Sequence, residues 1–207
     1  MADTEAHSKR KKKYKNSFSN ISQKEAESIL GFELDIFYDS QIPLKQFITT
    51  TTPEQLKKKI FERLIDCIIS EGYPEAAISP MNESVVRDNI GVILQAVVSY
   101  YKLTMNRNDL KLLREKEIIT KRDALGKGLV QLLLALKSMS NGNNDEKLVY
   151  GFLTTGIQWQ LVAYDGQKWK LSEASTVLLP KMIEKEDQWL KNNTQILDVI
   201  YNILSSI

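Results

Sequence analysis

Apolar side chains recur three and four positions apart in several stretches of the chain, and this spacing is typical of helices that bury one face. The predicted helices cover residues 23–30, 54–72, 82–97, 122–139 and 184–207. Local start signals support two of them. Ser22 with Glu25 three residues later forms a capping-box pattern. Thr52 followed by Pro53 is a strong helix start, with the threonine as the expected cap.

Short apolar or β-branched runs bounded by turn residues predict strands. They cover residues 98–103, 110–120, 148–155, 158–164 and 168–171. The last two are joined through Asp165-Gly166, the strongest hairpin signal in the chain. Residues 32–37 are expected to pack on the core as a strand or loop. Helices first, then strands mixed with helices, predicts an α/β or α+β fold, and we adopt the α/β class with a mixed central sheet flanked by helices.

Composition is consistent with one soluble globular domain of moderate size: the chain has 207 residues, 43% of them hydrophobic and 26% charged. Residues 1–20 are polar and charged, and we expect them to form a disordered basic tail when unbound. Residues 21–75 are interpreted as a helical N-terminal extension, and residues 76–207 as the α/β domain.

The net charge is only +2, but basic residues are concentrated near the N-terminus. They are Lys9, Arg10, Lys11, Lys12, Lys13 and Lys15. Such a run is typical of nuclear-localisation and nucleic-acid-contacting segments, and it equally fits a solubilising tail. No apolar run approaches the roughly 20 residues needed to cross a bilayer, and no apolar segment follows the basic run as in a secretory signal. We therefore expect a nuclear or cytoplasmic protein with no membrane partner.

Two residue types exclude common chemistries. His7 is the only histidine and lies in the basic tail, so a histidine-based acid–base or triad mechanism in the core is excluded. Cys67 is the only cysteine and lies among apolar helical residues, which predicts a small buried hydrophobe and excludes an internal disulfide or a zinc cluster.

Two carboxylates on a predicted strand are the main indication of a metal-binding or catalytic site. Glu115 and Glu117 are two residues apart, so they project from the same strand face. Two such carboxylates can bind a hard cation such as Mg²⁺, which can activate water against a phosphodiester. Together with Lys116 they also fit the solvated end of an edge strand, where a lysine discourages aggregation.

Three further polar residues accompany this strand. Glu83 opens the helix that precedes the predicted sheet, and Asp109 precedes the acidic strand. Gln131 lies on the next helix, from which it could point back at the strand.

These residues belong to a pattern that resembles the PD-(D/E)XK nuclease-like domains abundant in some fungi, including those found with crinkler-type effector proteins. The resemblance covers roughly the last three-fifths of the chain. Its matching pieces are residues 83–88, 114–117, 128–133 and 150–156, the last followed by Gln158-Trp159. The tyrosine-glycine stretch that ends in threonine-threonine-glycine, followed by tryptophan, is the most specific piece. The resemblance implies a restriction-endonuclease-like fold.

The resemblance also implies roles for individual residues. Glu83 matches the helix glutamate, Glu115 the strand acid and Gln131 the helix glutamine. The family's lysine falls on Glu117, which reverses the charge at that position.

A replacement for this lysine is not evident from the sequence. Lys116 points to the opposite strand face, whereas Lys121 or Lys127 could reach in from elsewhere.

The family's aspartate is also in doubt. Asp109 and Glu115 are six residues apart, about 20 Å in one extended strand, which is too far to share a cation. The intervening residues include no glycine, proline or asparagine that would favour a tight turn. The predicted hairpin is therefore shortened.

Three hypotheses follow. The first is a nucleic-acid-binding protein on a nuclease-like fold whose catalytic site is degraded, with the basic run contacting DNA or RNA. The second is an active Mg²⁺-dependent nuclease with Glu83, Glu115, Glu117 and Gln131 as catalytic residues, Asp109 as a further metal ligand and a relocated lysine. The third is a protein-interaction module without a nucleic-acid role.

Aromatic residues of the predicted hairpin have two interpretations as well. Trp159, Tyr164 and Trp169 could form a base-stacking platform, but such residues are more often cross-strand packing pairs.

Overall fold

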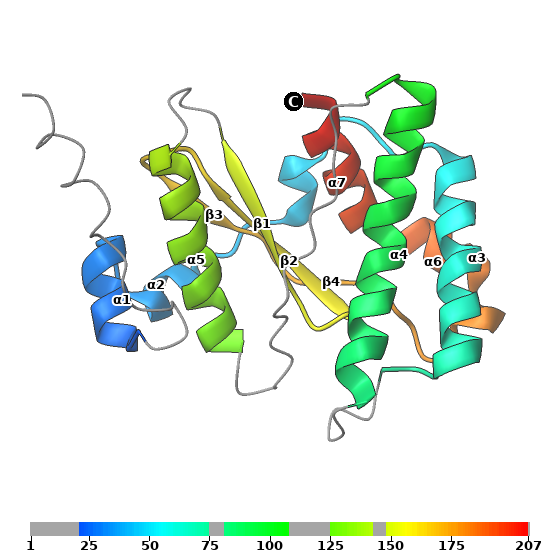
Figure 1. Ribbon diagram of the computed structural model, residues 1–207, viewed down its shortest axis with the longest axis horizontal. Coiled ribbons are helices and arrows are strands. Elements are labelled where there is room, and N and C mark those ends of the chain that lie inside the picture. Colours follow the sequence, from blue (N-terminus) through cyan, green and yellow to red (C-terminus); the bar gives the residue numbers. More distant parts are fainter. Residues whose placement is uncertain (1–20, 75–80, 108–124, 143–147, 207) are drawn as a thin grey trace, which may run out of the picture.

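The computed structural model describes residues 21–74, 81–107, 125–142 and 148–206. Its elements are α1 (Gln23–Leu30), α2 (Leu34–Asp39), η2 (Leu44–Phe47), α3 (Glu54–Glu71), α4 (Met81–Thr104), α5 (Leu125–Gly142), β1 (Val149–Thr154), β2 (Gln158–Tyr164), β3 (Trp169–Leu171), β4 (Ser175–Thr176), η4 (Met182–Glu184), α6 (Glu186–Asn192) and α7 (Gln195–Ser206). They form an α/β structure in which helices flank a small sheet (Figure 1). The predicted strand over residues 110–120 lies outside the described residues.

The sheet is built around β2. Strands β1, β3 and β4 all pair with it antiparallel. Among the described residues the parallel pairing is limited to an isolated bridge between Ile42 and Ser172. In this part of the chain β2 is therefore the central strand, and β1 is an edge strand.

The hairpin predicted at Asp165-Gly166 is confirmed, because Tyr164 pairs with Trp169 across it. The Asp165 carboxylate accepts hydrogen bonds from the backbone N–H groups of Gln167 at 2.9 Å and Lys168 at 2.6 Å, which lowers the pKa of Asp165. Gly166 adopts φ of 92°. The rings of Tyr164 and Trp169 stack with centroids 3.9 Å apart, so they form a cross-strand packing pair.

Hydrophobic cores lie on both faces of the sheet. Helices α1, α2 and α5 pack on one face, and α3, α4, α6 and α7 on the other (Figure 1). Strand β2 serves both, since Trp159 joins the α3–α4 core and Val162 joins the α5 core. Residues 21–74 also contribute to both, for example through Leu30 on the α5 side and Ile60 on the α3–α4 side.

Of the two helix starts predicted from local signals, that of α1 is confirmed in full and that of α3 in part. The capping box at α1 is confirmed, since Ser22 and Glu25 each hydrogen bond the other's backbone N–H. The start of α3 is confirmed, but the expected threonine cap is wrong. Pro53 is the N-cap residue, and the Thr52 hydroxyl has no hydrogen-bond partner in the described part of the chain. The Thr52 N–H donates to the Asp198 carboxylate of α7 at 2.7 Å.

Two predictions of extended structure are also wrong. Residues 98–103 continue α4, because Tyr101 lies four positions after Val97 on the buried face and its hydroxyl donates to the Tyr201 carbonyl oxygen of α7 at 2.7 Å. Within residues 32–37, Leu34 begins helix α2, and its N–H donates to the Glu27 carboxylate at 3.1 Å. Tertiary contacts outweigh local strand propensity at both places.

The predicted closing helix is divided in two. Asn193 separates α6 from α7, and its side chain donates to the Thr176 carbonyl oxygen at 2.7 Å. The Thr194 carbonyl then accepts from the N–H groups of Leu197 and Asp198 and begins α7. Within the described ranges, none of the helices combines the length and apolar character needed to span a membrane.

Candidate functional site

Two helices approach the C-terminal end of β1 from opposite faces of the sheet. On the α5 side, a Cβ built on Gly128 would lie 3.2 Å from Leu153 Cδ1. On the α4 side, a Cβ built on Gly156 would lie 2.9 Å from Val86 Cγ1. The first part of α4 and the first part of α5 therefore converge on one strand end, and these are the helices that carry Glu83 and Gln131.

The threonine-threonine-glycine sequence forms the turn at this strand end. The Thr154 hydroxyl accepts from the Gly156 N–H at 2.9 Å, and the Thr155 hydroxyl accepts from the Gln158 N–H at 3.1 Å. Gly156 has φ of 83°, a left-handed conformation that favours glycine. These residues satisfy the backbone of the turn, so they have a structural role here.

Gly151 allows α5 to lie close against β1. A Cβ at this position would stand 2.5 Å from Leu132 Cδ1 and 3.3 Å from Leu136 Cδ1. Trp159, which pairs with Thr154, is 1% exposed and packs edge-on against Phe152 with ring centroids 5.9 Å apart. Hence the most specific part of the motif is accounted for by close packing of α5, β1 and β2.

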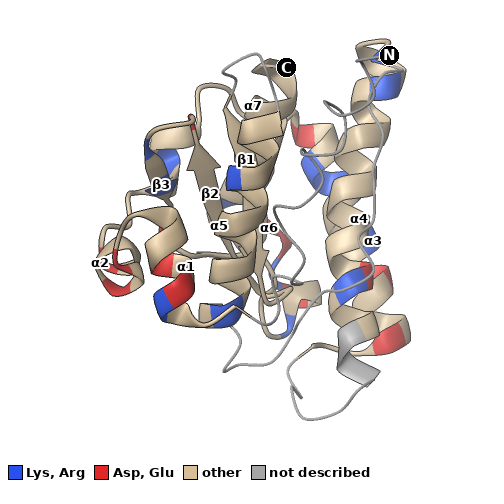
Figure 2. Cartoon of the chain, turned by 60° about the vertical axis from the view of Figure 1, so that its left-hand side comes forward, with Lys and Arg blue, Asp and Glu red and all other residues tan. Residues whose placement is uncertain are grey.

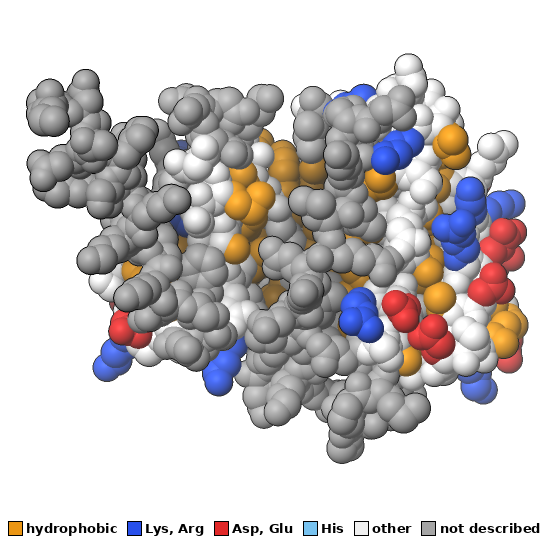
Figure 3. Space-filling view, viewed as in Figure 1, with side chains coloured by type: hydrophobic (Ala, Val, Ile, Leu, Met, Phe, Trp, Pro, Cys, Tyr) orange, Lys and Arg blue, Asp and Glu red, His pale blue; other side chains and the backbone are white. Residues whose placement is uncertain are grey.

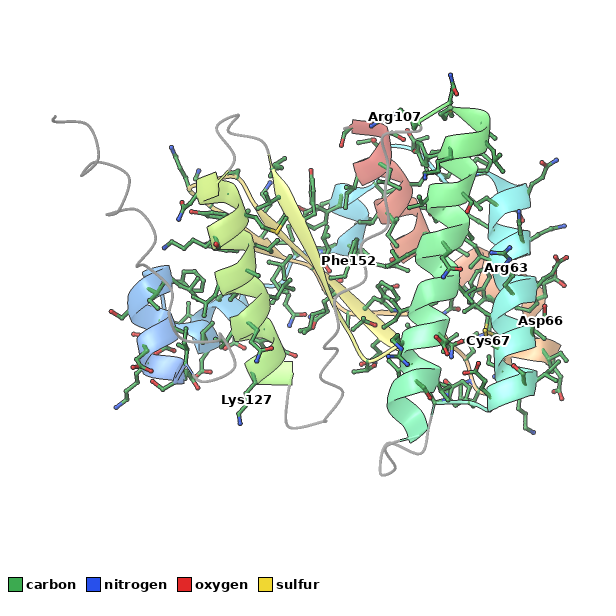
Figure 4. The ribbon with its side chains drawn as sticks, in the orientation of Figure 1. Arg63, Asp66, Cys67, Arg107, Lys127 and Phe152 are labelled. Carbon is green, nitrogen blue, oxygen red and sulfur yellow. The ribbon has the colours of Figure 1, made fainter. Side chains whose placement is uncertain are left out.

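The structure describes only some of the predicted site residues. Glu83 lies in the first turn of α4, although its side chain is not among the described ones. Gln131 is half-buried on α5, and Lys127, four positions earlier, lies on the same flank of the helix and is exposed (Figure 4). Glu115, Glu117 and Asp109 lie outside the described residues, as do the basic residues of the tail: Lys9, Arg10, Lys11, Lys12, Lys13 and Lys15.

Carboxylates elsewhere in the described ranges do not form an alternative metal site. In the four described ranges, no three histidine, cysteine, aspartate or glutamate side chains lie close enough together to hold a metal ion. Binding of Mg²⁺ thus stays a prediction about residues 109, 115 and 117.

One buried polar residue near this site was not predicted from the sequence. Asn89 lies on α4 one turn after Val86 and is 1% exposed. Its side-chain N–H donates to the Val85 carbonyl oxygen at 2.8 Å, while its own carbonyl oxygen has no partner in the described part of the chain. A polar residue on the apolar face that Val86 and Ile90 define was the available signal. A buried polar atom without a partner is destabilising by about 1–3 kcal/mol.

The α4-facing side of β1 is apolar. Phe152 lies on β1 between α5 and α4 (Figure 4), and hydrophobic side chains are visible over the sheet between these helices (Figure 3). Burial raises the pKa of the Tyr150 phenol on the same side, so this group is neutral at physiological pH.

Charge on the described residues is balanced. Their lysines and arginines do not outnumber their aspartates and glutamates, and both kinds are spread over several helices (Figure 2). Comparison of the chain with protein-family models, curated proteins and solved structures returned no match.

Proposed function

We propose that this protein binds nucleic acid on a restriction-endonuclease-like fold whose catalytic centre is degraded. The observation that carries the proposal is the convergence of α4 and α5 at the end of β1, which brings the helix of Glu83 and the helix of Gln131 to one strand end. The loss of catalysis rests on Glu117 at the position of the family's lysine and on the shortened segment between Asp109 and Glu115.

Phosphate binding is assigned to the basic run, because the described body has no excess of basic residues. Each phosphate contact with duplex DNA contributes about −0.9 to the slope of log affinity against log salt. Contacts from the whole run would contribute a slope of about −5 and make affinity fall about 10³-fold between about 50 and 200 mM salt.

The first prediction concerns this slope. Replacing the six basic residues by glutamine is expected to reduce its magnitude by up to about 5, because each replaced side chain no longer releases a counterion. Fluorescence anisotropy of labelled DNA and RNA over a salt series measures it. A charge-matched control replaces Lys58, Lys59, Lys168, Lys170, Lys181 and Lys191, which are all exposed. An equal loss of slope in the control would contradict the assignment to the tail, and absence of wild-type binding would contradict the function.

An active nuclease is the second candidate, favoured by the position of Lys127. This lysine and Gln131 share one flank of α5, so a relocated lysine has a described candidate. Its ammonium would offset charge beside the predicted acidic strand.

The second prediction separates the two candidates. Wild-type protein is expected not to cleave labelled single- or double-stranded DNA or RNA in Mg²⁺ or Mn²⁺, because two of the family's groups are altered. The assay compares wild type with Glu115→Ala and Lys127→Gln, and uses EDTA as the blank. Metal-dependent cleavage that disappears in Glu115→Ala would overturn the degraded centre, and its disappearance in Lys127→Gln would identify the relocated lysine.

A further inference from the structure

A groove with an apolar floor and an acidic rim lies between α1 and α2. Its volume is about 670 Å³. Phe32, Ile36 and Phe37 line it, and the Ile36 side chain is 66% exposed despite being fully apolar. An isoleucine this exposed beside two aromatic rings provides an anchoring surface for another apolar side chain.

The rim carries two carboxylates. Glu27 accepts from the Leu34 N–H at 3.1 Å and from Gln23 Nε2 at 3.2 Å, and these hydrogen bonds lower the pKa of Glu27 and keep it charged. Glu33 is exposed at the start of α2. Asp35 and Asp39 add further negative charge to α2, and acidic positions on both helices are visible in Figure 2. Lys24 is the one basic residue between positions 21 and 40. A ligand for this groove should therefore be basic and carry an apolar or aromatic group.

The chain itself contains such a segment directly before α1. Residues 9–15 hold five lysines, an arginine and Tyr14. Tyr14 precedes Ile21 by seven residues, which can span about 23 Å when extended. Helix α1, whose last turn borders the groove, has 8 residues and is about 12 Å long. The segment is therefore long enough to reach the groove in the same molecule.

We propose that the groove between α1 and α2 binds the chain's own basic segment, residues 9–15, with lysine or arginine side chains against Glu27 and Glu33 and Tyr14 against Ile36. This inference is independent of the proposed function. If nucleic acid also binds the segment, the groove and the nucleic acid compete for the same side chains.

Trypsin tests the proposal, because it cleaves after lysine and arginine and a docked segment is protected. A short linker gives an effective concentration of about 1 mM, so a groove with an intrinsic Kd of about 0.1 mM would slow cleavage about tenfold. The full-length chain is digested briefly, and mass spectrometry follows cleavage within residues 9–15. The groove variant combines Glu33→Gln with Ile36→Ser. The matched control combines Glu62→Gln with Ile69→Ser on α3, where Ile69 is 69% exposed.

The groove variant is expected to be cut within residues 9–15 about tenfold faster than wild type, and the control at the wild-type rate. Salt of about 0.5 M should raise the wild-type rate toward that of the groove variant, because it screens the charges without any substitution. Equal rates in wild type and groove variant would overturn the proposal. Wild-type protection that increases with protein concentration would overturn it too, since the occupant would then come from a second copy.

Discussion

Asp198→Ala is expected to lower the free energy of unfolding by about 3–5 kcal/mol, because it leaves a buried charge without its partner. Asp198 of α7 lies 3.1 Å from the Lys57 ammonium of α3, and both side chains are 9% exposed. The same carboxylate accepts the Thr52 N–H at 2.7 Å, just before α3 begins. Removing the carboxylate therefore leaves two buried donors, the Thr52 N–H and the charged Lys57 ammonium, without this acceptor.

Urea denaturation of four variants separates these contributions. Asp198→Asn keeps an oxygen for the Thr52 N–H but loses the ion pair, so its loss should be smaller than that of Asp198→Ala. The double variant Lys57→Met with Asp198→Asn removes both charges and is expected to recover most of the lost stability. Asp187→Ala, at an exposed position of α6, should change stability by less than about 0.5 kcal/mol. A loss below about 1 kcal/mol for Asp198→Ala would contradict the buried pair as a major link between α3 and α7.

This ion pair illustrates what the sequence could not supply. The α1 cap and the Asp165 hairpin were predictable because each depends on residues within three positions of one another. Thr52 and Asp198 are 146 positions apart, and their hydrogen bond depends on how α7 packs.

Helix α4 shows the same limit for secondary structure. Val98, Tyr100 and Tyr101 favour a strand locally, yet Tyr101 is held in the helix by its hydrogen bonds to Tyr201 and Ser205. Tertiary partners of this kind decide between helix and strand where propensities are close.

For the candidate site, too, local structure was predictable from the sequence and long-range packing was not. The sequence predicted a helix around Gln131, and the structure agrees, but the packing role of the glycines that bring this helix to β1 was not predicted. Gly128, for example, lies against Leu153. The close approach at Gly151 and Gly156 could not be read without knowing which helices would meet them.

Gly156→Ala is expected to destabilise the protein by about 2–5 kcal/mol, from two separate causes. The left-handed φ of 83° is unfavourable for alanine by about 1–2 kcal/mol. The new Cβ would also stand 2.9 Å from Val86 Cγ1, and overpacking of this kind is destabilising by about 1–3 kcal/mol. Val86 is β-branched and held in a helix, so it has little freedom to turn away.

Two other glycines separate these causes. Gly31 has φ of 88° and no atom within 4 Å of its built Cβ, so Gly31→Ala should show only the conformational cost of about 1–2 kcal/mol. Gly151→Ala should show only the cost of overpacking against Leu132 and Leu136, about 1–3 kcal/mol, and less if Leu132 changes rotamer. Urea or thermal unfolding of the three variants gives the comparison directly.

The decisive result is the coupling between Gly156 and α4. In a double-mutant cycle, Val86→Ala removes the γ carbons that the new Cβ would meet, so Gly156→Ala should be about 1–2 kcal/mol less damaging in that background. Absence of coupling, with Gly156→Ala no worse than Gly31→Ala, would mean that the turn does not hold the start of α4. The convergence of the Glu83 and Gln131 helices at β1 would then lose its physical cause, and the proposed function would lose the observation that carries it.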